Sequence, residues 1–295
     1  MGIVAGTAQL LLEESQVRPF GGDLLSLGRM DVYLSENELA ALASKTGTHL
    51  QPDIDVAPSH NPALAAHGCM DDQSFFRLLG FDTASSLDVS TYEGADIAHD
   101  LNLAVPDELH GRFDVVFEGG TIQHVFHLPR VLANIHALLK PGGRIIHGIA
   151  PAANYVDHGF HTFSPTLFQD FYSVNGWQIE SFLLCDFVAY WLGGRIHTDR
   201  FRVYPYEPGA LDPISYGRWG HRQTAIFFVA TRTPEATGDR IPQQGYYRQQ
   251  WDAASHTAKK TPRGPKPWDA LLAPLKLARE HMRRRWPSLP TRRRL

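Results

Sequence analysis

Six short, uninterrupted runs of apolar residues mark the strands that this sequence predicts. Runs without polar alternation are typical of strands that helices cover on both faces, as in a parallel sheet. The runs cover residues 23–28, 85–89, 113–117, 144–150, 178–184 and 224–230.

Helical patterns separate most of these runs. Ser35 and Glu38 have the spacing of a capping box, which predicts a helix over residues 36–44. Residues 72–79 form a second helical candidate, and residues 131–139 place their apolar side chains on one helical face. Strands that alternate with helices predict an α/β fold, doubly wound, with a mostly parallel sheet.

The chain divides into parts by composition. An N-terminal arm, residues 1–22, precedes an α/β domain over residues 23–232. Residues 186–223 separate the last two strands and are rich in aromatic side chains and arginines, so we expect an inserted cap there. A polar, proline-rich linker follows over residues 233–267, and residues 268–295 form a basic tail.

Charge is unevenly distributed along the chain. The formal net charge is −3, but residues 259–295 hold 12 Lys and Arg against two acids, a net of +10 that leaves −13 for residues 1–258. As a helix, the tail would place an apolar stripe beside this positive charge, which suits peripheral contact with an anionic membrane. A solvated helix, or one that packs in an oligomer, is the alternative. The acidic domain offers no basic groove, which argues against a nucleic-acid partner.

Composition excludes several other classes of protein. A hydrophobic fraction of 43% with 20% charged residues is that of a folded globular chain. Because no run reaches about 18 apolar residues and the N-terminus has no basic leader segment, we expect a cytoplasmic protein, peripheral to a membrane at most. Cys69 and Cys185 are too isolated for a disulfide framework or a thiolate metal site.

Three segments carry a resemblance to a known family. Phe113 begins the stretch FDVVFEGGTIQHVF, Leu139 begins LKPGGRIIH, and Asn154 begins NYVDHGFHTFSPTLF. Over residues 23–231 the chain resembles class I S-adenosylmethionine-dependent methyltransferases, and its third segment is similar to a branch associated with bacterial glycan and secondary-metabolite gene clusters. The resemblance implies a seven-stranded sheet whose last strand is antiparallel, with S-adenosylmethionine as cofactor across the carboxyl ends of the first strands.

The resemblance also implies cofactor-binding residues, with one departure. Gly28 alone stands where the family has a glycine-rich loop whose backbone approaches the methionine moiety closely. Asp88 matches the acid that accepts hydrogen bonds from the ribose hydroxyls. Asp100 matches the acceptor of the adenine amino group, and the backbone amide of Leu101 would meet the adenine ring.

The fourth strand would end at Glu118 and Gly119, which should then border the sulfonium. The residues themselves leave alternatives open for the two aspartates: Asp88 could cap a turn, and Asp100 could be a solvated loop acid.

Histidines supply the candidates for a catalytic base. His124 follows the predicted fourth strand, and His158 and His161 lie beyond the fifth. Because imidazole titrates near neutral pH, it can take a proton from a hydroxyl as the new bond forms; His124 and His158 are the favoured bases and His161 the third candidate. A structural hydrogen-bonding role is the alternative for each. We expect no metal, since there is no partner cysteine and no HExxH pattern.

The sequence therefore predicts an enzyme that methylates an oxygen or nitrogen of a small polar or glycan-type acceptor. The degenerate glycine loop leaves a second hypothesis open, a catalytically silent protein that keeps the fold for binding or scaffolding. The sequence predicts no particular oligomeric state.

Overall fold

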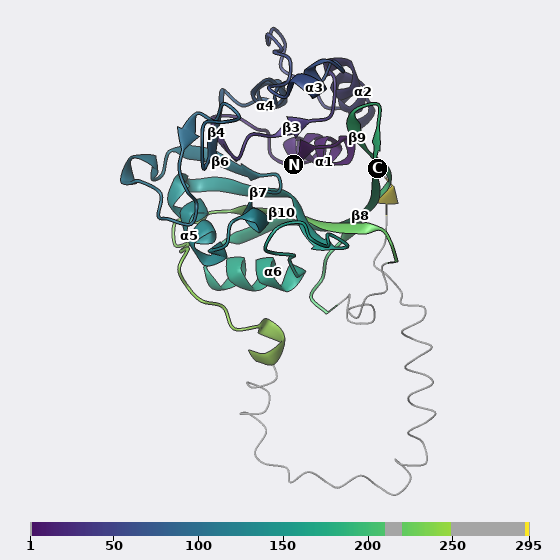
Figure 1. The fold of residues 1–295 in the computed structure, drawn as a ribbon. Helices are drawn as coiled ribbons and strands as arrows, with labels where there is room; N and C mark the ends of the chain where they lie inside the picture. The colour runs from purple at the N-terminus through teal and green to yellow at the C-terminus, as the bar shows by residue number, and fades with distance from the viewer. Residues whose placement is uncertain (1, 210–219, 249–292, 295) are drawn as a thin grey trace, which may run out of the picture.

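A twisted nine-stranded sheet runs through the molecule (Figure 1). The computed structural model describes residues 2–209, 220–248 and 293–294. Among these residues no helix is both long and apolar enough to cross a lipid bilayer.

One half of the sheet is parallel. It has the order β5 (Ile97–Ala98), β4 (Thr83–Asp88), β2 (Asp23–Leu27), β6 (Phe113–Glu118) and β7 (Leu139–Ala153). All four pairings between these neighbours are parallel, so the five strands end at one edge of the sheet. In open α/β sheets this carboxyl edge is where ligands bind.

The other half of the sheet is antiparallel. β10 (Gln223–Thr231) lies between β7 and β8 (Gln178–Leu192) and is antiparallel to both. β8 then forms a hairpin with β9 (Arg195–Pro205), and β11 (Arg293–Arg294) pairs with β9. The hairpin curves toward α2 in Figure 1, where the Arg195 Nη1 atom lies 2.9 Å from Oε2 of Glu38.

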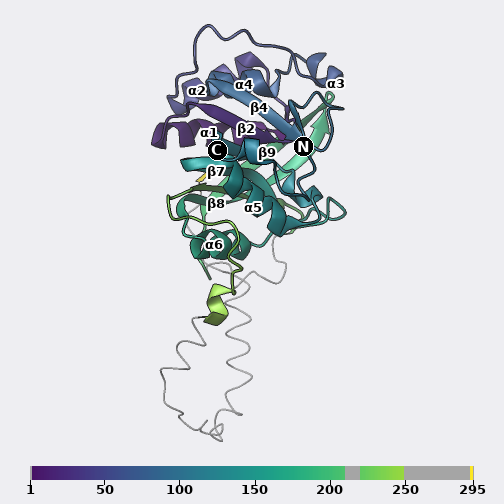
Figure 2. The same ribbon diagram turned by 90° about the vertical axis from the view of Figure 1, so that its left-hand side faces the viewer.

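Helices cover both faces of the sheet (Figure 2). On one face lie α1 (Ala5–Val17), α2 (Glu36–Thr46) and α4 (Asp72–Leu79), whose apolar side chains form one core cluster with the strands. On the other lie α5 (Leu128–Leu138) and α6 (Pro165–Val174), which form the second. Both faces of the strands are thus buried, as the uninterrupted apolar runs predicted.

Several short elements lie outside the nine-stranded sheet. β1 (Gly2–Ile3) pairs in parallel with β3 (Asp31–Val32) in a separate two-stranded sheet. α3 (Pro62–Ala65) and two 3₁₀ turns, η1 (Asp107–Leu109) and η2 (Ile122–His124), lie in the connections.

Local signals in the sequence fix several helix ends. The capping box is present: the Ser35 hydroxyl accepts from the Glu38 N–H and a Glu38 carboxylate oxygen accepts from the Ser35 N–H at 2.8 Å. Asp71 caps α4 by accepting from the Gln73 N–H at 3.0 Å. Ser164 does the same for α6, where Pro165 takes the first helical position.

The predicted fold class is confirmed, and three details differ. The sheet has nine strands rather than seven, because β9 and β11 extend the seven strands β5-β4-β2-β6-β7-β10-β8. The predicted N-terminal arm contains α1, which is part of the domain because its leucines are buried in the core. The expected cap is largely sheet, because residues 186–192 continue β8 and residues 195–205 form β9.

The predicted linker and tail lie mostly outside the described residues. The described parts are residues 233–248, which begin by packing on the domain, and residues 293–294 in β11. The Trp177 Nε1–H donates to the Thr237 carbonyl at 2.8 Å, and the Asn175 side-chain amide donates to the Arg240 carbonyl at 3.0 Å. The tail's amphipathic helix remains a prediction.

Candidate active site

The predicted cofactor residues meet at the carboxyl edge of the parallel strands. Leu27 of β2 pairs with Leu87 of β4 on one side and with Glu118 of β6 on the other. The residues that follow these three therefore lie side by side, which brings Gly28, Asp88 and Gly119 together although they are far apart in sequence.

Gly28 is closely enclosed at this edge. Its φ of +84° is disfavoured for other residues, and a Cβ there would lie 2.8 Å from Oγ1 of Thr121 and 3.5 Å from Oδ2 of Asp88. The Thr121 hydroxyl donates to the Leu27 carbonyl and so ties the loop after β6 to the end of β2. Gly28 is therefore strongly favoured at this position, although the chain lacks the other glycines of the family's loop.

Asp88 has one carboxylate oxygen occupied and one available. Oδ1 accepts from the N–H of Val89 at 2.6 Å, as expected of a turn acid. Oδ2, the atom nearest to Gly28, has no hydrogen-bond partner among the described residues. The geometry thus accommodates both of the alternatives for Asp88: one oxygen caps the turn and the other can accept from a ligand.

The side chain of Asn134 fixes the backbone of the loop after β5. Asn134 of α5 is buried, and its Nδ2 donates to the carbonyls of Leu101 and Leu103 at 3.1 and 2.8 Å. The Leu101 N–H has no acceptor within the described part of the chain, so it is available for an adenine nitrogen. His99 has a buried Nε2 that is also without a partner in that part of the chain.

Asp100 caps the turn rather than pointing alone into solvent. Its Oδ1 accepts from the N–H and the Nδ2 of Asn102 at 2.9 and 2.8 Å. These hydrogen bonds lower the pKa of Asp100, so it is ionised at neutral pH and can accept a further hydrogen bond.

Glu118, which was expected to border the sulfonium, has its side chain turned into the core. Its side chain is fully buried, and Oε1 accepts from the N–H groups of Gly120 and Thr121 at 2.6 Å each. Oε2 lies 3.0 Å from Nδ1 of His147. Burial raises the pKa of Glu118, but the hydrogen bonds from His147 and the backbone outweigh it and lower the pKa. The carboxylate therefore holds the loop that follows β6.

Gly119 lies against the side chains around Gly28. A Cβ on Gly119 would lie 2.7 Å from Sδ of Met30 and 2.8 Å from Cε1 of Phe117. The close approach of backbone and side chains here explains why a glycine follows β6.

An ion-pair cluster lies directly after Gly28, where the chain lacks the other glycines of the family's loop. Arg29 is 8% exposed; Nη2 contacts the Asp71 carboxylate and lies 2.8 Å from Oδ1 of Asp72, while Nη1 donates to the Gly94 carbonyl at 3.0 Å. Oδ2 of Asp72 accepts from the Met30 N–H at 2.8 Å. Burial raises the pKa of Asp72 to about 6, although Arg29 and the Met30 amide oppose the shift.

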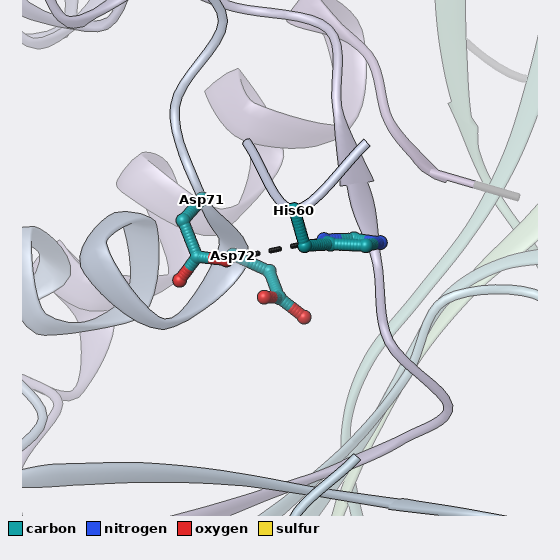
Figure 3. A group of neighbouring side chains, drawn as sticks. All are labelled: His60, Asp71 and Asp72. Atoms are coloured by element: carbon teal, nitrogen blue, oxygen red, sulfur yellow. Dashed lines mark ion pairs between the residues drawn. The ribbon is translucent and has the colours of Figure 1, made fainter. Parts of the chain in front are cut away.

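The same cluster has the donor types of a metal site. Ligand atoms of His60, Asp71 and Asp72 lie within 4.8 Å of one another, and Figure 3 shows them grouped at the start of α4. The Arg29 guanidinium already supplies the positive charge that these carboxylates need, so we assign an ion-pair cluster here. The cluster was not predicted from the sequence, although a charged residue directly after a buried strand, as Arg29 is after Gly28, was a usable signal.

Two of the three predicted bases lie together. The rings of His124 on η2 and His158 in the loop after β7 meet edge to face, with centroids 5.2 Å apart. Burial and then the neighbouring His158 lower the pKa of His124, so its imidazole is neutral near neutral pH. A neutral imidazole is the form that accepts a proton.

The third candidate, His161, holds the two loops together. Its Nε2 lies 3.2 Å from the Phe126 carbonyl oxygen, and the Gln123 carbonyl accepts from the N–H groups of Phe160 and His161 at 2.7 and 3.2 Å. The structure thus favours the structural alternative for His161.

An open hollow adjoins the histidine pair. Its volume is about 360 Å³, and residues 152–157 and 159–162 line it. Tyr155, one of its walls, has its ring centroid 5.8 Å from that of His158. At its rim the rings of Phe126 and Phe160 meet edge to face at 5.5 Å while 70% and 65% exposed.

Part of the chain is similar to a known protein family. Residues 78–147 match the family model described as a methyltransferase domain. No curated protein matches the sequence.

Solved structures are similar at low identity. They include a Bacillus halodurans protein provisionally assigned as a methyltransferase (11% identity, 76% of this chain and 98% of that chain, TM-score 0.41). A Thermotoga maritima S-adenosylmethionine-dependent methyltransferase has 14% identity over 78% of this chain and 90% of its own, with a TM-score of 0.35. A 16S rRNA (adenine(1408)-N(1))-methyltransferase from Catenulisporales acidiphilia has 14% identity over 81% and 93%, with a TM-score of 0.34.

The matched residues span β4, β5, β6 and the start of β7, the strands whose edge carries Asp88, Leu101 and Gly119. The seven strands β5-β4-β2-β6-β7-β10-β8, of which β10 is the last in sequence and antiparallel to its neighbours, match the sheet that the resemblance implies. The chain therefore contains a methyltransferase domain with the class I fold, and S-adenosylmethionine is the cofactor that such a domain uses.

Proposed function

We propose that the enzyme methylates an oxygen or nitrogen of a small polar or glycan-type acceptor, with His124 or His158 as the base. The observation that carries this proposal is the contact between these two histidines, which come from different loops and meet beside the carboxyl edge of β6. Burial and the neighbouring His158 shift the His124 pKa toward the neutral form.

The chemistry of the reaction explains the need for a base. S-adenosylmethionine supplies a methyl group on an already activated leaving group, so the protein's task is to align the acceptor with that methyl group. A hydroxyl acceptor must also lose its proton. An imidazole at hydrogen-bond distance from that hydroxyl would accept the proton as the new bond forms.

The surroundings of the histidine pair suit an acceptor with a ring. Aromatic faces pack against the apolar face of a sugar or another ring, and Phe126 and Phe160 present such faces at the rim. The hollow itself has polar walls, among them Asn154, Asp157 and Thr162, that can hydrogen-bond hydroxyl groups. A volume of about 360 Å³ is in the range of small-molecule sites.

The residues at the strand ends fit the adenosine half of the cofactor. Asp88 has an available carboxylate oxygen next to Gly28, and Leu101 has an available N–H on the adjacent loop. The buried, unpartnered Nε2 of His99 is a further polar atom that a polar ligand would satisfy. We propose that Asp88 binds the ribose hydroxyls and that Asp100 and Leu101 bind the adenine.

Asp88→Ala is expected to weaken cofactor binding without unfolding the domain. The change removes charge-assisted hydrogen bonds to the ribose, each worth about 1.5–3 kcal/mol. Calorimetric titration with S-adenosylhomocysteine measures the loss. Asp107→Ala is the matched control, because its side chain is fully exposed. Equal affinity of the Asp88 variant and wild type would remove Asp88 from the site.

Peripheral membrane contact through the basic tail is proposed from the sequence alone. Deleting the residues after Lys266 should weaken binding to vesicles of anionic lipid at low salt, where surface charges are least screened. Binding to neutral vesicles should be weak in both forms. If the full-length protein ignores anionic vesicles in a sedimentation assay, the membrane proposal fails while the methyltransferase assignment stands.

A further inference from the structure

Three buried polar side chains form a continuous hydrogen-bonded chain under the site. The Tyr172 hydroxyl on α6 lies 2.7 Å from Nε2 of His147, and Nδ1 of His147 lies 3.0 Å from Oε2 of Glu118. The side chains of His147 and Glu118 are fully buried, and Tyr172 is 1% exposed. A buried polar network of this kind is costly unless every member is satisfied.

The direction of each hydrogen bond follows from the charge on Glu118. Because the pKa of Glu118 is lowered, its carboxylate is an acceptor only, so Nδ1 of His147 carries a proton and donates it. The pKa of Tyr172 is raised well above its ordinary value, mainly by burial, so the phenol keeps its proton. In the neutral imidazole, Nε2 then accepts from the Tyr172 hydroxyl.

The other end of the chain is the loop between β6 and η2. Oε1 of Glu118 accepts from the N–H groups of Gly120 and Thr121, and the Ile122 N–H also donates to it at 3.3 Å. The Thr121 hydroxyl binds the end of β2, and Gln123 accepts from the loop that carries His158. A single loop, residues 119–124, thus joins the buried chain, the cofactor edge and both histidines.

We propose that Tyr172, His147 and Glu118 are positioning residues that fix the 119–124 loop and thereby place the His124 imidazole against His158. The role of His124 as a base rests on the proposed function. The fixing of the 119–124 loop by the three buried side chains does not. The Glu118 carboxylate is the link: with one oxygen it reaches the loop amides and with the other the imidazole, and the Tyr172 hydroxyl fixes the orientation of that ring.

Simple packing is the competing account, because the same rings also form part of the core. The His147 ring lies 4.8 Å from Phe168 and 5.9 Å from Tyr172, centroid to centroid. Tyr172→Phe separates the two accounts, because it keeps the ring and removes only the hydroxyl. Tyr204→Phe, a buried tyrosine on β9, is the matched control.

Tyr172→Phe should raise the amide hydrogen-exchange rates of Gly120, Thr121 and Ile122 by about five- to tenfold. The increase should not extend to β10 or α5. The second readout is the His124 pKa, measured by NMR titration of its imidazole; it should lie below the ordinary value in wild type and move toward it in the variant. Tyr204→Phe should change neither readout.

Glu118→Ala and Glu118→Gln provide the conservative test. A glutamine can accept from the loop amides with its oxygen and donate to Nδ1 of His147 with its amide, provided that His147 changes tautomer. Exchange in the Gln variant should therefore stay within about threefold of wild type, and the Ala variant should lose protection at residues 120–122.

The outcomes distinguish the two proposals. Unchanged exchange at residues 120–122 in Tyr172→Phe, or an equal increase across the whole domain, overturns the positioning chain. Exchange at residues 120–122 can respond as expected while turnover does not depend on His124. That result supports the positioning role of Tyr172, His147 and Glu118 and overturns His124 as the base.

Discussion

Arg29→Ala is expected to lower the free energy of unfolding by about 3–5 kcal/mol near neutral pH, the cost typical of removing one partner from a buried ion pair. The Asp71 and Asp72 side chains are 11% and 2% exposed, so water cannot replace the guanidinium. Urea unfolding followed by circular dichroism measures the loss.

The loss should shrink as the pH falls. Burial raises the pKa of Asp72 to about 6 in the folded protein, above its unfolded value near 4, so the folded state binds more protons in that window. Stability contributed by this group therefore rises as the pH falls through the window and is fully regained below it. Without Arg29 the pKa should rise further, and the deficit relative to wild type should be smaller at about pH 5 than at pH 7.

Two further variants test the cause. Arg200→Ala removes an exposed ion pair with Asp199, 3.5 Å long and more than 60% exposed on both sides, and should have little effect. Adding Asp72→Asn to Arg29→Ala should recover part of the lost stability, because it removes a buried charge. The ion-pair account would be contradicted if the stability lost in Arg29→Ala were the same at all pH values and were not partly recovered by Asp72→Asn.

Replacing the catalytic base should lower turnover by about 10²–10⁴-fold while cofactor binding persists, if the acceptor is a hydroxyl. His124→Ala and His158→Ala are the test variants, since one of the two is expected to take the proton. His197→Ala is the control, because that histidine lies on β9 and stacks on Tyr190 at the exposed hairpin. The measurement is turnover with a panel of glycosides and small phenols under saturating cofactor.

The pH profile gives an independent check on His124. A base must be neutral to act, so turnover should rise with pH through the pKa of the base and then level off. Burial and His158 lower the pKa of His124, so the rise should be centred below the ordinary value of about 6.5. If both alanine variants keep turnover within a few-fold of wild type, another group or alignment alone carries the reaction.

Local patterns in the sequence were enough to predict the sheet and most helices. The six apolar runs lie within β2, β4, β6, β7, β8 and β10 or extend them by a single residue, because strands covered on both faces need continuous apolar sequence. α4 spans residues 72–79 as predicted, since Asp71 caps its start and Gly80 ends it in a left-handed conformation. The α1 helix was missed because its leucine-rich sequence has no side-chain cap or polar face to mark it.

The candidate site was only partly predictable, because its key contacts join residues far apart in the chain. His124 and His158 were named from the sequence as the favoured bases, and their rings lie together. The position of the Glu118 side chain depends on His147, 29 residues away, and that of Arg29 depends on two acids 42 and 43 residues away. No local pattern specifies such contacts. A strand-end acid can face a ligand or turn into the core, and only the packing of the neighbouring strand decides which.

The central claim is that S-adenosylmethionine binds across the carboxyl ends of β2 and β4. Amide hydrogen exchange of the full-length protein, with and without S-adenosylhomocysteine, tests it most directly because it maps the site and requires no acceptor. We predict slower exchange at residues 28–31, 88–90 and 99–102, with β9 unchanged. No protection at saturating ligand, or protection confined to other segments, would contradict the claim and favour a silent protein that keeps only the fold.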